Sequence, residues 1–131
     1  MNFQDEFAEK AKEHLKPDPD EKIVKEWSAE IGGYFLRLQS KIGDVKDRTF
    51  VCTASPVQAI IEMDNVGLRL TLRKQSIPFT IAVTKIKDRL ASDYDTLFLK
   101  DGELYSEKLD KPFSIPILEQ YLKDTFDFLD L

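Results

Sequence analysis

The sequence has few of the residues that form disulfides or bind metals. It contains one cysteine, Cys52, and one histidine, His14, among 131 residues. A single cysteine excludes a disulfide within the chain, and the two residues together are too few for a zinc site of the usual composition. Cys52 stands in a β-prone segment, which favours a buried core thiol over a nucleophile. His14 lies near the end of a predicted helix, which favours an exposed side chain over a catalytic base.

Glycine and long apolar runs are also scarce. The five glycines show neither G-x-G-x-x-G nor P-loop spacing, so we predict no phosphate-binding loop and no cofactor. The longest stretch free of Asp, Glu, Lys and Arg is residues 49–61, which is shorter than the roughly 20 apolar residues that span a bilayer. The first residues include acids and no apolar signal segment. These absences predict a soluble, cytoplasmic protein that does not bind membranes.

No excess of basic residues favours a nucleic-acid partner. The chain has 24 acidic and 19 basic residues, and its formal net charge is −5. A negative domain is repelled by phosphate backbones unless a local basic patch overrides the total. The best candidate patch consists of Arg69, Arg73, Lys74, Lys85, Lys87 and Arg89. We interpret these residues as the solvated face of a hairpin.

Two neighbouring segments alternate strictly between apolar and polar residues. In residues 66–73 and again in 77–84, apolar side chains occupy every second position. A period of two predicts strands with one buried and one wet face, as in antiparallel sheets. Further β-prone segments at residues 49–53 and 57–63 precede them. Pro78 predicts an edge position, a strand start or a bulge.

Helical spacing flanks these strands on both sides. Phe3, Phe7, Ala11 and Leu15 form one stripe of a helix over residues 2–15. A second helix is predicted from the N-cap Asp18 to Ile42, with Gly43 as its C-cap, and its middle is apolar around much of its circumference. Ser114 as a cap and Pro116 in the first turn predict a last helix, which extends to about residue 129.

The sequence therefore predicts one α+β domain over residues 1–131. We expect two N-terminal helices, an antiparallel sheet of about five or six strands in residues 49–106, and one C-terminal helix, with the helices packed on one face of the sheet. Asp64-Asn65 and Asp101-Gly102 are predicted hairpin turns, and residues 85–93 a polar connection. Gly32-Gly33 inside the second helix predicts a close neighbour or a local bend.

Two groups of carboxylates are candidates for binding a cation. Glu62 and Asp64 share one side of a strand, and Asp124, Asp127 and Asp130 recur every three residues in the last helix. Solvated polar faces explain both patterns, so we predict no metal site.

The apolar residues of the helices exceed what one sheet face requires. Internal packing explains this surplus if the first helix covers the second, and burial against a second chain is the alternative. Trp27, Tyr34, Tyr121 and Phe128 are the candidate partner-binding residues, because these aromatic types are enriched at interfaces.

The hypothesis that follows is a small acidic, non-enzymatic binding or accessory protein. Its partner would be another protein, as for small acidic chaperones and immunity proteins of similar architecture, or a second copy in a homodimer. The alternative is a small-molecule or enzymatic site between the sheet and the helices, with Glu62, Arg69, Arg73, Tyr94 and Tyr105 as its polar candidates.

Overall fold

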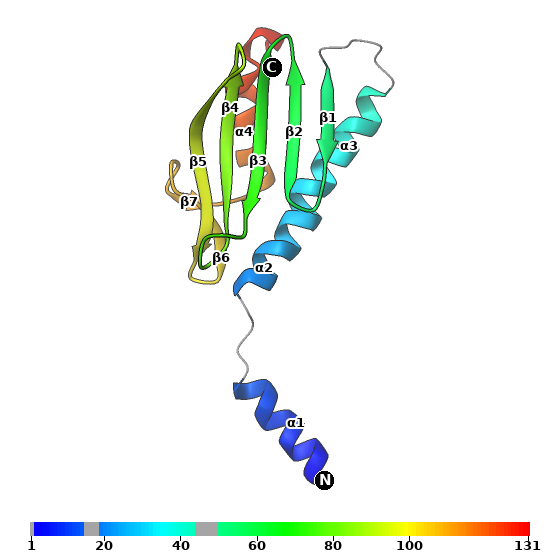
Figure 1. Cartoon of the computed structure of the whole chain (residues 1–131), viewed down its shortest axis with the longest axis vertical. Helices are drawn as coiled ribbons and strands as arrows, with labels where there is room; N and C mark the ends of the chain where they lie inside the picture. Colours follow the sequence, from blue (N-terminus) through cyan, green and yellow to red (C-terminus); the bar gives the residue numbers. More distant parts are fainter. Residues whose placement is uncertain (1, 15–18, 44–49) are drawn as a thin grey trace.

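A computed structural model describes residues 2–14, 19–43 and 50–131 of the chain. It confirms an α+β fold, in which an N-terminal helix and a long helix precede an antiparallel sheet and a C-terminal helix (Figure 1). The helical elements are α1 (Phe3–His14), α2 (Pro19–Glu26), the π-helical turn η1 (Trp27–Gly32), α3 (Gly33–Ile42), α4 (Ile115–Thr125) and the 3₁₀ turn η2 (Asp127–Leu129).

The sheet of the described residues is a simple meander of seven strands. Each strand pairs antiparallel with the next along the chain, in the order β1 to β7. The strands are β1 (Val51–Ala54), β2 (Gln58–Met63), β3 (Val66–Arg73), β4 (Thr80–Lys87), β5 (Leu90–Lys100), β6 (Glu103–Ser106) and β7 (Lys111–Pro112). The helices α2, α3 and α4 lie on one side of the sheet, and Figure 1 shows no helix on the other side among these residues.

The alternating pattern that predicted the central hairpin corresponds to two opposite sheet faces. Leu68, Leu70 and Leu72 of β3 are buried toward the helices, whereas Arg73 is exposed. The polar positions pair across the hairpin on the other face, with Arg69 opposite Thr84, although Thr84 is only 6% exposed. The sequence placed β3 correctly, because a period of two leaves only one register that buries the leucines.

Three turns of the meander contain two successive residues of positive φ. Asp64 and Asn65 have φ of 52° and 64°, and the predicted turn at Asp101 and Gly102 has φ of 52° and 78°. A third such turn, at residues 88–89, joins β4 to β5, so the prediction of a polar connection over residues 85–93 was wrong. Arginine at the second position, with φ of 68°, gives no turn signal in the sequence.

Strand limits differ from the prediction where proline intervenes. β4 begins at Thr80 rather than at position 77, so Pro78 lies two residues before the strand and not within it, as the prediction had placed it. The two-residue strand β7 contains Pro112 and was missed, because the sequence suggested only an entry to the last helix. Leu15, Asp18 and Thr49, which the predicted elements include, lie outside the described residues.

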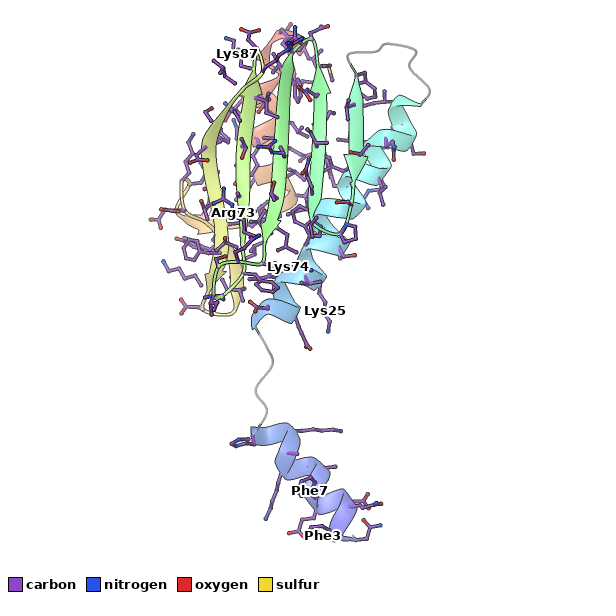
Figure 2. All side chains as sticks on the ribbon, viewed as in Figure 1. Phe3, Phe7, Lys25, Arg73, Lys74 and Lys87 are labelled. Carbon is purple, nitrogen blue, oxygen red and sulfur yellow. The ribbon has the colours of Figure 1, made fainter. Side chains whose placement is uncertain are left out.

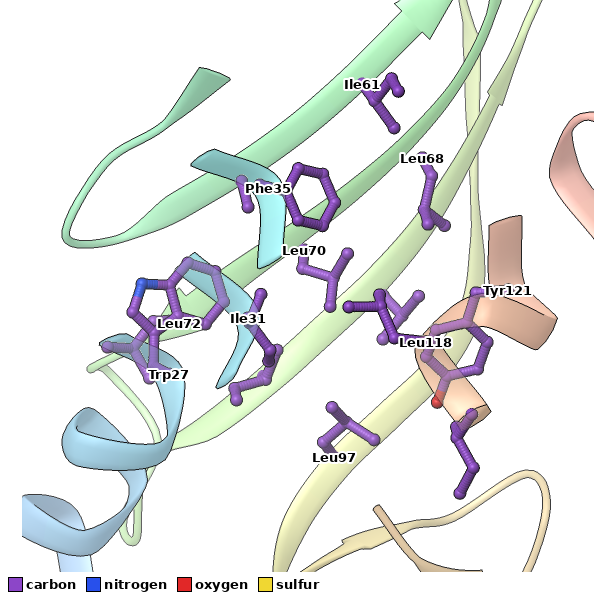
Figure 3. Close-up of a cluster of buried hydrophobic side chains, with 14 of the residues drawn as sticks. Trp27, Ile31, Phe35, Ile61, Leu68, Leu70, Leu72, Leu97, Leu118 and Tyr121 are labelled. Carbon is purple, nitrogen blue, oxygen red and sulfur yellow. The ribbon is translucent and has the colours of Figure 1, made fainter. Parts of the chain in front are cut away.

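The long helix from Pro19 to Ile42 contains one π turn. Ile23, Trp27, Ile31 and Phe35 are all buried against the sheet, as Figure 3 shows for the last three. A spacing of four residues drifts by about 40° per step around an α-helix, and the wider π turn takes up part of that drift. The N–H of Gly33 donates to the carbonyls of Ser28 and Glu30, so the two glycines occupy this local irregularity.

The C-terminal helix is shorter than predicted. Leu118 and Tyr121 of α4 are fully buried beside the sheet (Figure 3), but the helix ends at Thr125 and a 3₁₀ turn follows. The regular helical spacing of three aspartates therefore does not hold beyond Asp124. No group of three metal-ligating side chains occurs among the described residues.

Helix α1 does not cover the second helix. Figure 1 shows it apart from the sheet and from the other helices, and the side chains of Phe3 and Phe7 are 77% and 63% exposed. The two rings lie close to each other, with their centroids 6.0 Å apart. The expected packing of the first helix inside the monomer is therefore absent, and its apolar stripe faces solvent.

Candidate functional site

A β-bulge in the central part of the sheet determines the position of Tyr94. Val83 of β4 pairs with Asp95, whereas its neighbour Thr84 pairs with Asp93, so Tyr94 is the extra residue of β5. A bulge redirects a side chain that regular alternation would send to the other face. Here it lets Tyr94 and Asp95 both lie on the side of α4, where they contact Asp124 and Tyr121 respectively.

Tyr94 is in contact with charged groups on several sides. Its hydroxyl donates to Oδ2 of Asp124 at 2.5 Å, and the Nζ atoms of Lys85 and Lys108 lie 4.1 and 3.6 Å from its ring centroid. Burial, and then the hydrogen bond to Asp124, raise the pKa of Tyr94. The same hydrogen bond is the main reason why the pKa of Asp124 is lowered. Tyr94 therefore remains a neutral donor to an ionised acceptor at neutral pH.

Asp95 is the centre of a buried hydrogen-bond network below Tyr94. Its Oδ2 accepts from the hydroxyls of Ser106, at 2.5 Å, and of Tyr121, while Oδ1 accepts from the backbone N–H of Thr96 and of Lys108 at 2.7 and 2.9 Å. The carboxylate is 7% exposed and has four donors. Such a satisfied network fixes β5, the segment after β6 and α4 to one another.

Two clefts border Tyr94 and Lys108. One, of about 410 Å³, is also lined by Arg73, Asp93 and Glu107, and the other, of about 610 Å³, extends between α4 and the segment around β7. Acidic and basic groups are mixed in both. We name the region formed by these two clefts the Tyr94 cleft. Its walls are polar, as in a small-molecule site, but its strongest donors and acceptors already form hydrogen bonds with each other.

The polar residues that the sequence suggested do not form one site. Arg73 and Tyr94 line the same cleft. Glu62 and Arg69 lie on the open sheet face, on β2 and β3. Tyr105 lies on β6, where its hydroxyl donates to Asp110 at 2.6 Å and its ring packs on Phe98.

The basic residues of the predicted patch are also dispersed. Figure 2 shows Arg73 and Lys74 at one end of the sheet and Lys87 at the other. Lys85 lies on the helix side, against Tyr94. The six residues therefore do not all share one surface.

A second hollow region follows one flank of the long helix. Three hollows of about 460, 280 and 560 Å³ succeed one another from Asp20 to Gly43, and adjacent hollows share Val24 and Leu36 in their linings. Val24 and Leu36 are 37% and 53% exposed, and Ser28 and Gly32 lie between them on the helix. We name this continuous depression the helix groove.

The opposite wall of the helix groove is the edge of the sheet. Residues Phe50 to Thr53 line its upper part and Ala54, Ser55 and Pro56 its middle. β1 is an edge strand that pairs only with β2 in the described sheet, and its Val51 is 39% exposed. Large apolar side chains at the two ends and small residues in the middle make a surface that another backbone can approach closely.

The four aromatic residues predicted to bind a partner have different environments. Trp27 and Tyr121 are core residues: Trp27 is 2% exposed and its Nε1 donates to the carbonyl of Ser55 at 3.2 Å, and Tyr121 is 0% exposed. Tyr34 is half-buried, and its hydroxyl donates to Glu119 of α4 at 3.4 Å. Phe128 remains 49% exposed after α4. Sequence reasoning missed Val24 and Leu36, because it assigned them to the covered arc of the helix.

The two remaining reactive side chains, Cys52 and His14, have environments that are typical of structural residues. The Cys52 thiol is buried, donates weakly to the carbonyl of Phe35 at 3.7 Å, and has its pKa raised by burial. Burial therefore keeps the thiol protonated and unreactive. His14 is the exposed last residue of α1. None of the helices in the described part of the chain is long and apolar enough to cross a membrane.

Comparisons with known proteins place the chain in a family. Searches of curated proteins and of solved structures found no match. One family model, described as a protein of unknown function, matches residues 5–129. Because this match covers most of α1 and all of the long helix, the sheet and α4, the chain belongs to the family DUF3942.

Proposed function

We propose that this protein is a non-enzymatic protein-binding domain that receives an amphipathic helix of its partner in the helix groove. The observation that carries the proposal is the exposure of Val24 and Leu36 on either side of the small residues Ser28 and Gly32. Exposed large apolar side chains that line a continuous depression mark interaction sites more often than scattered ones do.

The shape of the groove favours a helix as the bound element. Val24, Ser28, Gly32 and Leu36 are spaced by four residues along one flank of the long helix. A helix that packs along this flank would bring its own apolar residues, at spacings of three and four, against the small residues in the middle. The partner segment is therefore expected to carry bulky apolar residues at i and i+4 and to be polar on its other side.

The Tyr94 cleft supports catalysis less well than the groove supports binding. Asp95 is saturated by four donors, and Asp124 accepts from Tyr94 and from Gln120. A general base needs a free acceptor within reach of the substrate proton. Both carboxylates instead hold the fold together.

A groove-specific loss of binding would test the proposal. The wild-type chain, the double variant Val24→Asp/Leu36→Asp and the control Leu90→Asp would be used to retain partners from the native source. Leu90 is 76% exposed and lies at the start of β5, which does not line the groove. We expect one protein that binds wild type and the control equally, and that binds the groove variant at least tenfold more weakly when reassembled from purified components.

Hydrogen exchange would locate the contact. Protection on binding is expected in residues 24–36 and in β1. Equal affinity of wild type and the groove variant, or protection elsewhere, would overturn the proposal. The folded state of each variant is verified by the fluorescence of Trp27, which is the one tryptophan of the chain and is buried.

A second candidate function rests on the bulge at Tyr94. The bulge and the two adjacent clefts suit a small polar ligand held by Lys108, which lines both clefts. A metabolite panel would be assayed by thermal shift, since a ligand that binds only the folded state raises the melting temperature. We expect any genuine shift to disappear in Lys108→Ala. Failure of every compound to shift wild type would remove this candidate.

A further inference from the structure

We infer that the helix that occupies the helix groove is α1 of a second copy of this chain, so that two copies exchange their first helices. The inference rests on the proposed function and names the partner of the same groove. It joins two apolar surfaces that remain exposed in the monomer, the stripe of α1 and the groove beside β1.

Helix α1 has the pattern that the groove requires. Phe3 and Phe7 stand at i and i+4, and Ala11 continues the stripe. The two phenylalanines are 77% and 63% exposed, and Figure 2 shows both side chains on a helix that lies away from the rest of the molecule. A helix this short is marginal in water alone, so its stability depends on a surface that covers its apolar side.

The length of α1 matches the middle part of the groove. α1 has 12 residues, which corresponds to about 18 Å at the rise of an α-helix. Val24 and Leu36 are 12 positions apart on the groove, so the groove between them has about the same length. One α1 helix therefore spans the middle of the groove, which continues beyond Val24 toward Asp20 and beyond Leu36 toward Gly43.

The charges of α1 and the helix dipoles favour an antiparallel orientation. α1 has Asp5 and Glu6 in its first turn and Lys12 and His14 in its last. The long helix likewise begins with Asp20 and Glu21 and has Lys41 in its last turn. An antiparallel arrangement brings the acidic first turn of α1 toward the end of the long helix that carries Arg37 and Lys41, and it also pairs the helix dipoles favourably.

This orientation gives a definite register. Phe3 would lie against Leu36, Phe7 over Gly32, and Ala11 beside Ser28. A large ring then meets the smallest residue of the groove. In the same register His14 comes opposite Lys25, one turn away from Glu21 at the start of the long helix.

The position of α1 favours exchange over a return to its own groove. In Figure 1, α1 points away from α2 and from the sheet. Reciprocal exchange gives a closed, two-fold dimer in which each groove is filled once.

Two complementary variants of the full chain test the exchange. Phe3→Asp/Phe7→Asp removes the helix stripe but keeps the groove, and Ser28→Arg fills the groove from an exposed position without touching the core. Light scattering is expected to give twice the chain mass for wild type and for the control Leu90→Asp, and the single chain mass for each variant alone. A mixture of the two variants should recover heterodimers, because one intact helix then meets one intact groove.

Cysteine cross-linking distinguishes a second copy from the same chain. A chain with Ala11→Cys and a chain with Ser28→Cys are mixed and oxidised, while the native Cys52 is buried. We expect a disulfide-linked heterodimer on a non-reducing gel. A single chain that carries both substitutions and links only within itself would overturn the exchange.

Failure of this inference can be told from failure of the proposed function. A wild-type chain that remains monomeric up to high micromolar concentration, or heterodimers that do not form in the mixture, would overturn the exchange. Either result would leave the proposed function intact, because a foreign protein could still bind in the groove. Dimers that persist in Ser28→Arg but not in the α1 variant would instead indicate direct pairing of two α1 helices, which also overturns it.

Discussion

At the scale of single residues, buried hydrogen bonds decide how the sheet and α4 are joined. Asp95 accepts four hydrogen bonds from two side chains and two backbone groups, and it is 7% exposed. Each of its donors would lose its partner if the carboxylate were removed. The Tyr121 and Ser106 hydroxyls are themselves buried, so the loss leaves polar groups that water reaches poorly.

The first prediction concerns this carboxylate. Asp95→Ala should lower the free energy of unfolding by about 2–4 kcal/mol, because it leaves buried donors unsatisfied. Urea unfolding followed by Trp27 fluorescence measures the effect. Asp93→Ala, two positions earlier on the same strand and exposed, is the matched control and should change stability by about 0.5 kcal/mol or less. Similar losses for both variants would contradict the role assigned to the network.

The hydrogen bond between Tyr94 and Asp124 should make stability depend on pH. The pKa of Asp124 is lowered in the folded chain, chiefly by this bond, so its contribution is present above the ordinary carboxyl pKa and is lost as pH falls through the folded value. The pKa of Tyr94 is raised, chiefly by burial, so its contribution is present below the ordinary tyrosine pKa and is lost as pH rises through the folded value. The bond therefore stabilises the chain between about pH 4 and pH 10.

The second prediction uses this window. Tyr94→Phe should lower stability by about 1 kcal/mol at pH 7, and the difference from wild type should shrink as pH falls below the ordinary carboxyl range and Asp124 becomes protonated. Denaturant unfolding at a series of pH values gives the two curves. A difference that stays constant down to the acid limit would mean that the lost ring contacts with the lysines, rather than the hydrogen bond, explain the change.

At the scale of elements, the turns of the meander carry much of the topology. Asp64-Asn65, Asp88-Arg89 and Asp101-Gly102 each contain two residues of positive φ. Such turns match the twist of adjacent antiparallel strands. Only the last contains the glycine that this geometry prefers, so the strand pairing itself must hold Arg89 in a left-handed conformation that costs roughly 1 kcal/mol.

The third prediction compares two of these turns. Arg89→Gly should raise the free energy of unfolding by about 0.5–1 kcal/mol, because relief of the left-handed strain outweighs the greater freedom of glycine in the unfolded chain. Gly102→Ala should lower it by about 1 kcal/mol for the opposite reason. Denaturant unfolding measures both changes through the shift of the midpoint, provided that the slope of the free energy against denaturant concentration is unchanged. A loss of stability in Arg89→Gly would show that the arginine side chain contributes more than the backbone strain costs.

At the scale of the whole molecule, the core and α1 are separate contributions. Ile31 is fully buried between the long helix and the sheet, as Figure 3 shows, whereas Phe3 and Phe7 are mostly exposed. The hydrophobic effect stabilises a fold only through area removed from water. The stability of a single chain therefore comes from the sheet and the helices packed on it, and α1 becomes stabilising only when a surface covers it.

The fourth prediction follows from this separation. Phe3→Ala/Phe7→Ala should change the free energy of unfolding by about 0.5 kcal/mol or less at protein concentrations where the chain is monomeric. Ile31→Ala should lower it by about 2–5 kcal/mol, because it leaves a cavity in the core. Urea unfolding at low and at high protein concentration measures both. A large loss for the α1 variant at low concentration would show that α1 packs on its own chain.

Much of the fold could be predicted from local patterns. β3 was predicted at its observed limits, and Gly43 caps the long helix through its N–H and the carbonyl of Gln39, as expected. The β4–β5 hairpin was missed because Arg89 and Asp88 lack a glycine signal, and the pairing of distant residues decided that turn. Tyr94 was a candidate by residue type alone, since the bulge that positions it leaves no local trace.

The sequence by itself determined the α+β class, the antiparallel sheet and the apolar face of each strand, because periodicity is a local property that each segment carries alone. Only the tertiary structure decided which apolar residues remain exposed to solvent. Trp27 and Tyr121 pack inside the chain, whereas Phe3, Val24 and Leu36 remain exposed, although all are apolar residues of helices. Burial depends on which elements meet in space, and no helix of the same chain covers α1 or the groove in the described structure.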